Sequence, residues 1–171
     1  MRRACLPIRQ SAAPSIAAHS GAVGTALVYE NGVPETVEER LHVARRIVEA
    51  AEAHGIPGDD VLIDAVCLPS AVQPDSMRTA LRTLDALHEE LGMPTLLGIS
   101  SAGFLMPDAR FIDLACFLAA VASDLDVAMI DPETPLLAWQ HRSIDFLLGK
   151  DPYAEAFLRL HRATCAEERG S

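Results

Sequence analysis

Polar side chains stand near the carboxyl-terminal ends of four short apolar segments in this 171-residue sequence. They are Asp64, the pair Ser100 and Ser101, residues 30–31 (Glu-Asn) and Asp131. A carboxylate among apolar neighbours is costly to bury unless hydrogen-bond donors face it, so Asp64 is expected to face something polar. In α/β proteins the carboxyl ends of parallel strands form the ligand-binding end, and these residues therefore predict a binding site there.

Each of these residues also has a structural interpretation. Asp64 could accept hydrogen bonds from neighbouring strand or loop groups, and Asp131 before Pro132 could form a turn. Residues 98–103 (GISSAG) differ from the G-x-S-x-G nucleophile elbow of serine hydrolases, because two residues separate Ser100 from the second glycine. Serine hydrolase chemistry is therefore not favoured.

The composition favours one packed domain, residues 1–171, and excludes several classes of partner. Half of the residues are apolar, and 14 Lys and Arg against 24 Asp and Glu give a net charge of −10. A chain this acidic, with no basic stripe, is not expected to bind nucleic acid. The longest nearly apolar stretch, residues 111–121, contains Asp113 and is shorter than the roughly 20 residues of a membrane span.

The cysteines and the first residues indicate a cytoplasmic protein without a resident metal. Four cysteines lie far apart with no C-x2-C pair, so neither a zinc site nor a disulfide scaffold is predicted. Cys67 and Cys116 are expected to be small core residues. Residues 1–13 lack the apolar core of a secretory signal, and they are either a true start or the ragged edge of a longer reading frame.

Four segments rich in Val, Leu and Ile predict buried parallel strands, because none alternates cleanly with polar residues. Helical patterns separate them. A capping box at Thr36 and Glu39 begins the first helix, and the second helix spans about residues 77–91. The third helix spans about residues 108–123 and is expected to be flanked on both sides. Its apolar stripe is Phe111, Leu114, Ala115, Leu118 and Ala122, widened by Cys116, Phe117 and Val121. A further segment ends at Gly149, and Asp151-Pro152 begins a last helix. The four strand segments are residues 22–29, 61–68, 94–100 and 126–131.

This alternation predicts an α/β fold built from four parallel βα units with right-handed crossovers. Either a closed eight-stranded barrel or an open doubly wound sheet can be built from such units, but four units are too few for the closed barrel, whose typical length is about 250 residues. The glycine-rich phosphate-binding loops G-x-G-x-x-G and G-x-x-x-x-G-K-[ST] are both missing from the sequence, which argues against nucleotide binding.

Longer motifs carry a resemblance to a known family. Residues 98–132 (GISSAGFLMPDARFIDLACFLAAVASDLDVAMIDP) resemble the G-L-S-N-V-S-F-G-L-P-x-R segment and the N-x-x-F-L-x-x-A-x-x-x-G-L-D-x-A-I-x-D pattern of pterin-binding methyltetrahydrofolate methyltransferases. Upstream, residues 32–40 are similar to the G-x-P-x-T-x-x-E-R core, and residues 63–69 to I-D-P-L-x-L-P. The likeness covers about residues 14–163.

The resemblance implies a (βα)8 TIM barrel, of which this chain matches the last four strands. It implies methyltetrahydrofolate as substrate and a corrinoid (cobalamin) protein as partner and methyl acceptor. Asp64 matches the family's carboxylate that binds the amino-pyrimidine edge of the pterin, and Gly98, Ser100 and Arg110 are further substrate-binding candidates. Ser101 takes the catalytic position, where a hydrogen bond or proton must reach the nitrogen that loses its methyl group.

Two departures from the family pattern affect this site. The family has Asn where this chain has Ser101, and a hydroxyl lacks the reach and the second function of an amide. The family has Arg where this chain has Ala109, although Arg110 is the next residue. An Asp and an Asn on the family's first four strands have no counterpart in this sequence.

Two alternatives remain open at this point. A non-catalytic half-barrel would need a homodimer or a complementary N-terminal half-barrel to cover its unpaired strand edges. A dihydropteroate synthase-like enzyme is the weaker alternative, because those relatives carry Arg-Lys after the Ser, where this chain has Ser101 and Ala102.

Overall fold

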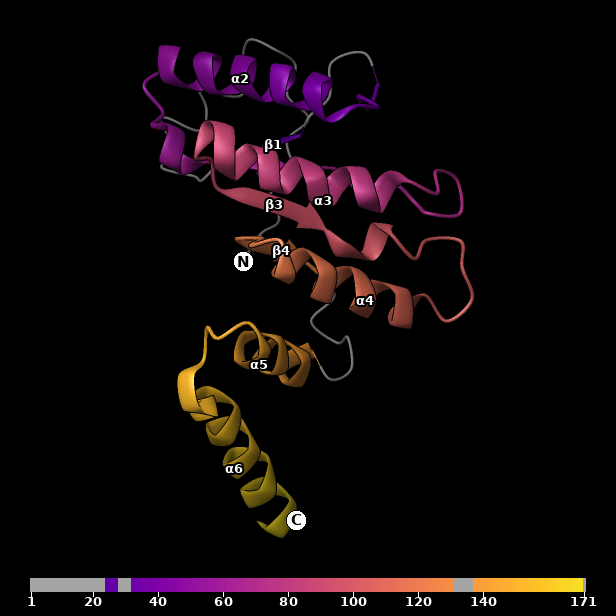
Figure 1. Ribbon diagram of the computed structural model, residues 1–171, viewed down its shortest axis with the longest axis vertical. Helices are drawn as coiled ribbons and strands as arrows, with labels where there is room; N and C mark the ends of the chain where they lie inside the picture. The colour runs from indigo at the N-terminus through magenta and orange to yellow at the C-terminus, as the bar shows by residue number, and fades with distance from the viewer. Residues whose placement is uncertain (1–23, 28–31, 131–136, 171) are drawn as a thin grey trace.

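Four parallel strands form a single sheet in the order β1-β2-β3-β4 (Figure 1). The computed structural model describes residues 24–27, 32–130 and 137–170, with side chains for residues 32–130 and 137–165. The strands occupy the predicted segments but are shorter, and residues 30–31 and Asp131 lie outside the described residues. The strands are β1 (Gly24–Leu27), β2 (Val61–Asp64), β3 (Thr95–Gly98) and β4 (Val127–Met129).

A helix follows each strand along the chain, and consecutive helices contact one another. Figure 1 shows α2, α3, α4 and α5 succeeding one another in the order of the strands, with α6 extending beyond α5 at the C-terminal end. A single layer of successive helices is consistent with part of a barrel wall. The helices are α2 (Val37–Ala53), α3 (Ser76–Ala86), α4 (Ala109–Ala122), α5 (Leu137–Leu147) and α6 (Glu155–Gly170).

Short helical turns complete the connections between these elements. They are η1 (Gly58–Asp60), the π-helical turn η2 (Leu87–Leu91) that continues α3, η3 (Ile99–Ser101) and η4 (Pro152–Ala154). In the described part of the chain, no helix combines the length and the apolar character that a bilayer span requires.

The beginning of α2 confirms the predicted capping box. The Glu39 N–H donates to the Thr36 hydroxyl at 3.3 Å, and the Thr36 N–H donates back to the Glu39 carboxylate at 3.2 Å. Those hydrogen bonds satisfy backbone donors that the first helical turn leaves unpaired. They also lower the pKa of Glu39. The start of α2 is thereby fixed at Val37, three residues before Arg40.

The sheet separates a helix-covered face from a second face. Val61 and Ile63 of β2 lie in the core beneath α2, and Leu97 of β3 lies in the core beneath α3 and α4. Because alternate residues of a strand point to opposite faces, Asp64 and Gly98 at the strand ends point to the face away from the helices. Both residues belong to the predicted site.

The apolar stripe predicted for α4 is confirmed for Cys116, Phe117 and Val121 and wrong for Phe111, Ala115 and Ala122. The buried residues of α4 are Cys116, Phe117, Ala120 and Val121, whereas Phe111 is 63% exposed. The helix is apolar over most of its circumference, so the sequence pattern does not single out one face. Contacts with α3 and α5 on either side select the face that is buried.

Asp151, in the connection between α5 and α6, is a helix-capping residue as predicted. Its two carboxylate oxygens accept hydrogen bonds from the N–H groups of Ala156 and Phe157, each at 3.0 Å. These bonds lower the pKa of Asp151. The η4 turn lies between this residue and α6, so the aspartate caps the helix from farther upstream than an adjacent N-cap does.

Candidate functional site

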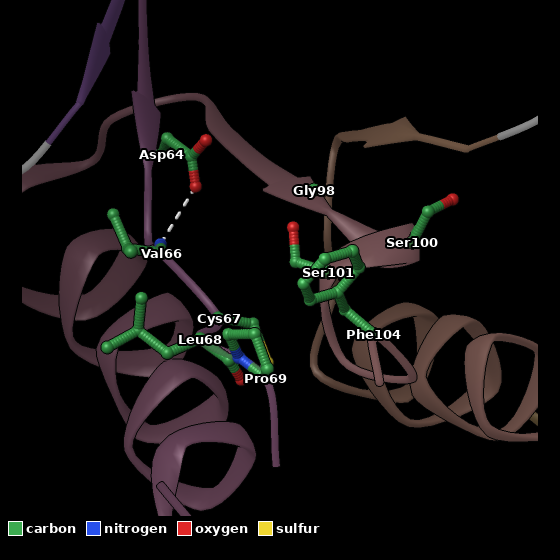
Figure 2. Close-up of a pocket in the computed structure, with 9 residues that line it drawn as sticks. All are labelled: Asp64, Val66, Cys67, Leu68, Pro69, Gly98, Ser100, Ser101 and Phe104. Carbon is green, nitrogen blue, oxygen red and sulfur yellow. Dashed lines mark hydrogen bonds between the residues drawn. The ribbon is translucent and has the colours of Figure 1, made fainter. Parts of the chain in front are cut away.

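A cavity of about 380 Å³ opens at the carboxyl ends of β2 and β3 (Figure 2). Four of the residues expected at the site from the sequence line it, namely Asp64, Gly98, Ser100 and Ser101. The cavity therefore joins residues that are more than thirty positions apart in the sequence. The remaining lining residues are Val66, Cys67, Leu68, Pro69 and Phe104.

Asp64 is a buried carboxylate on one wall of this cavity. Only 7% of the residue is exposed. One of its oxygens, Oδ1, accepts the N–H of Val66 at 2.8 Å, a hydrogen bond visible in Figure 2. Val66 has a φ of 54°, an unfavourable conformation for a β-branched residue. The turn that places this N–H over the carboxylate is therefore strained.

Burial raises the pKa of Asp64 to about 6, although two interactions oppose this shift. The Val66 N–H and the positive charge of Arg40 both favour the ionised form and lower the pKa. Burial is the larger effect because one N–H donor and a charge out of contact do not replace the lost water. Near neutral pH the carboxylate is consequently ionised yet short of donors.

Arg40, the last residue of the motif at residues 32–40, holds the backbone next to Asp64. This role was not predicted from the sequence. The Arg40 side chain is fully buried. The Nη1 group donates to the carbonyl oxygens of Ala65 and Val66 at 2.6 and 3.1 Å, and Nε donates to the Pro34 carbonyl at 2.9 Å. Arg40 thus fixes the backbone of the residues that follow Asp64.

The remaining nitrogen of Arg40, Nη2, is buried and has no hydrogen-bond partner in the described structure. Burial lowers the pKa of this guanidinium, and the nearby Cys67 and Asp64 partly offset that effect. A buried cation with a free donor creates a positive field at the turn after β2. That field favours negative charge on both neighbouring side chains.

The two serines of the η3 turn are not equivalent. Both are exposed, but Figure 2 shows the Ser101 side chain on the side nearer to Asp64, whereas the Ser100 side chain points away from it. A Cβ atom added to Gly98 would lie 3.5 Å from the Ser101 hydroxyl, an ordinary contact. The space around position 98 would therefore accommodate a larger residue than glycine.

The loop after η3 forms the outer rim of the cavity and is held by α4. The Gly103 N–H donates to the Asp113 carboxylate at 3.2 Å. A Cβ atom at position 103 would lie 2.7 Å from that carboxylate and 2.9 Å from the Ala109 carbonyl oxygen, so only glycine fits. Phe104 follows directly and is 60% exposed at the cavity rim.

Arg110 does not line the cavity. It lies in the first turn of α4, where its guanidinium is 3.8 Å from the Asp108 carboxylate and 4.9 Å from the centre of the Phe111 ring. The structure therefore brings four of the five expected site residues together and leaves Arg110 apart from them. Within the described residues, no group of three or more His, Cys, Asp or Glu side chains could hold a metal ion.

A comparison with models of protein families identifies the family to which the chain belongs. The model of the family described as pterin binding enzyme matches residues 4–131, three quarters of the chain. The chain belongs to the pterin-binding enzyme family. This confirms the pterin-binding family expected from the motifs at residues 32–40, 63–69 and 98–132. The narrower assignment to methyltetrahydrofolate methyltransferases and the correspondence to the last four barrel strands stay predictions.

Curated relatives agree with this membership. The chain is similar to methionine synthase of Mycobacterium leprae, with 31% identity over 110 residues, 60% of this chain and 9% of the relative. It is also similar to methylcorrinoid:tetrahydrofolate methyltransferase of Eubacterium limosum, with 22% identity over 131 residues, 74% of this chain and 48% of the relative. The chain thus spans about half or less of the relatives it matches.

The raised pKa of Asp64 gives a pH-dependent prediction. A carboxyl group that binds its proton more tightly when folded stabilises the fold at low pH, and this stabilisation is lost as the pH rises through the folded pKa of about 6. Relative to the native chain, Asp64→Asn should gain about 2–3 kcal/mol in free energy of unfolding between pH 4 and pH 7.5. Urea unfolding of both proteins across this range measures the difference.

Asp75→Asn is the control, because Asp75 is exposed and pairs with Arg78 on the surface. Its stability difference from the native chain should change little over the same pH range. A pH-independent difference for Asp64→Asn would mean that the Asp64 carboxyl has an ordinary pKa in the folded chain.

Proposed function

We propose that this pterin-binding chain binds methyltetrahydrofolate and takes part in transfer of its N5 methyl group to a corrinoid carried by a partner protein. One observation carries the proposal: the buried Asp64 and the Ser101 hydroxyl line one cavity at the carboxyl ends of adjacent parallel strands. In our proposal the sheet forms part of a TIM barrel and corresponds to its last four strands.

Asp64 is suited to recognise the amino-pyrimidine edge of a pterin. Val66 occupies one lone pair of Oδ1, which leaves the other oxygen free to accept ligand N–H groups. Neighbouring N–H donors on a ring match a carboxylate in a bidentate arrangement. Such donors favour the ionised carboxylate, so ligand binding should lower the pKa of Asp64 and remove part of the penalty of its burial.

The cavity and its rim suit a bicyclic ring. A volume of about 380 Å³ lies in the range of small-molecule pockets, and Pro69 and Phe104 add apolar surface beside the polar groups. Ser100 and Gly98 are proposed to contact the ring along the end of β3. For Arg110 to join them, its side chain has to leave Asp108.

Ser101 is proposed to assist departure of the methyl group. A methyl group on a tertiary amine transfers poorly because the departing nitrogen would carry negative charge. The Ser101 hydroxyl donates a hydrogen bond toward that nitrogen, while Asp64 holds the ring. The reduced cobalt of the partner's corrinoid supplies the nucleophile that accepts the methyl group.

Binding of methyltetrahydrofolate tests the anchor role of Asp64. Asp64→Asn should weaken binding by roughly 10–100-fold, because a hydrogen bond to a charged group contributes about 1.5–3 kcal/mol. Isothermal titration calorimetry at neutral pH with (6S)-5-methyltetrahydrofolate gives the dissociation constants. Asp75→Asn changes an aspartate in the loop after β2 that does not line the cavity, and it should bind like the native chain. No binding to the native chain at millimolar ligand would defeat the claim that this chain suffices for pterin recognition.

Ser101→Asn tests the position beside the transferred methyl. Asn supplies a longer donor and restores the residue of the resembling family, and it should raise the rate of methyl transfer to reduced cobalamin on the order of 10². The loss of methyltetrahydrofolate absorbance and the formation of methylcobalamin are followed together. Ser123→Asn is the matched control and should give no such gain, because Ser123 lies at the C-terminal end of α4 and does not line the cavity. Equal rates for both variants would contradict the role of Ser101.

A second candidate function is that of a non-catalytic half-barrel that pairs with a second copy or with a complementary half. The exposure of Val127 and Met129, 37% and 42%, favours it. Ala128 between them packs into the core beneath the helices, so its two neighbours point to the opposite face of the sheet. Apolar side chains on that face would be covered by a second sheet.

Sedimentation velocity distinguishes this second function. If the sheet face is the pairing surface, the native chain sediments as a dimer, and Met129→Lys converts it to a folded monomer. Phe146→Lys, at an exposed apolar position of α5, should leave the dimer intact. A folded native monomer that binds folate would contradict obligatory pairing.

A further inference from the structure

Three sulfur atoms from separate parts of the chain meet behind the cavity wall. Cys67 follows β2, Met77 lies in the first turn of α3, and Cys116 lies in the middle of α4. The Met77 sulfur is 3.8 Å from the Cys67 sulfur and 3.4 Å from the Cys116 sulfur. The role proposed for the folate site uses none of these sulfurs.

Both thiols are buried, but one of them can be reached from solvent. Cys67 and Cys116 are almost fully covered by neighbouring side chains. Cys67 nevertheless lines the cavity at the carboxyl end of β2, so a small ion that enters the cavity reaches this thiol first (Figure 2). The Met77 sulfur contacts the sulfurs of both cysteines, so an ion that reaches Cys67 is close to all three sulfur ligands.

The charges around the cluster favour a thiolate at Cys67. A hydrogen bond from the Cys116 thiol, a hydrogen bond from Ser76 and the buried charge of Arg40 lower the pKa of Cys67 against the opposing effect of burial. The hydrogen bond that Cys116 makes to the Cys67 sulfur raises the pKa of Cys116, and burial raises it further. The Cys116 thiol therefore donates a hydrogen bond to the Cys67 sulfur, and Cys67 is the more acidic of the two thiols.

We propose that Cys67, Cys116 and Met77 form a binding site for a single soft monovalent metal ion of the Cu(I) class. Thiolate and thioether sulfurs are the ligands that such an ion prefers. In a trigonal site with metal–sulfur bonds of about 2.3 Å, the sulfurs lie about 4.0 Å apart. The two observed distances from Met77, 3.8 and 3.4 Å, lie within about 0.6 Å of that separation, so the Met77 sulfur has to move by less than an ångström to bind a metal shared with each thiol.

The ligand set argues against a harder divalent ion. Zinc takes four nitrogen, oxygen or thiolate ligands in structural sites. No such group of three or more His, Cys, Asp or Glu side chains forms among residues 32–130 and 137–165. The third ligand at this cluster is a neutral thioether, which binds soft monovalent ions and adds little to a zinc site.

Metal binding deprotonates the cluster. The metal replaces the thiol proton of Cys116, and that of Cys67 where this thiol is protonated. The released protons pass to solvent, and two metal–thiolate bonds and one metal–thioether bond form. One positive metal ion with two thiolates has a net charge of −1. The guanidinium of Arg40 interacts favourably with charge at Cys67, so a cation is already present to stabilise the loaded site.

Metal binding to the reduced full-length chain tests this site. Ag(I) serves as a redox-inert probe, and Cu(I) is delivered under anaerobic conditions in competition with a chromophoric Cu(I) chelator. A Cys5→Ser, Cys165→Ser background leaves the two cluster cysteines as the only thiols. We expect one ion per chain, release of up to two protons, and X-ray absorption with sulfur neighbours alone at about 2.3 Å.

Met77→Leu in the same background separates a metal site from a pair of reactive thiols. It retains an apolar side chain of similar size and both cysteines. It should weaken metal binding by at least roughly 10–100-fold. Removal of an outer-shell partner already costs that much metal affinity, and Met77 is a direct ligand in the proposed site. Met93→Leu changes another buried methionine away from the cluster and should have no effect.

Several results would overturn the proposal. They are unchanged affinity in Met77→Leu, nitrogen or oxygen neighbours in the absorption spectrum, and formation of a Cys67–Cys116 disulfide in place of a metal complex. Cys67→Ser and Cys116→Ser should each abolish binding, and far-ultraviolet circular dichroism verifies their folding. If either variant fails to fold, the Met77→Leu comparison decides the question. The outcome is independent of folate binding, which is measured separately.

Discussion

The site depends on one constraint, the need to hold a carboxylate at the buried end of a parallel strand. Among the residues that the structure describes, Val66 is the one backbone donor to Asp64, and this donor is available because the chain turns through a left-handed conformation. Arg40 holds the carbonyl groups of the same turn from the first part of α2. A helix that packs on one face of the sheet thereby fixes the geometry of a side chain on the other face.

This arrangement leaves both charges incompletely satisfied. Arg40 keeps one buried nitrogen without a partner, and burial raises the pKa of Asp64 despite the nearby cation. Neither group neutralises the other through a direct ion pair, which would close the carboxylate to a ligand. Because the two charges are separated, the Asp64 carboxylate can still accept a hydrogen bond from a ligand. Ionisable groups with shifted pKa values are typical of binding sites.

The order of the elements and the meeting of Asp64, Gly98, Ser100 and Ser101 at one cavity could be predicted from the sequence. The capping box at Thr36 and the apolar strand segments carry local signals, and the carboxyl ends of parallel strands must meet, so Asp64 and the Ser100–Ser101 pair converge. The contribution of Arg40 could not be foreseen, because its bonds join residues 25 and 26 positions away. The position of Arg110 and the buried face of α4 depend on packing between helices, which periodicity does not encode.

The sequential strand order has a consequence for how the chain assembles. Each strand pairs with the strand before it, and each helix packs against its predecessor, so long-range closure of the chain is not needed to bury the first units. Each strand pairing closes a loop only one βα crossover long, which costs less entropy than pairing strands that lie farther apart in the sequence. Each βα unit can therefore pack onto the strand before it as the chain is synthesised.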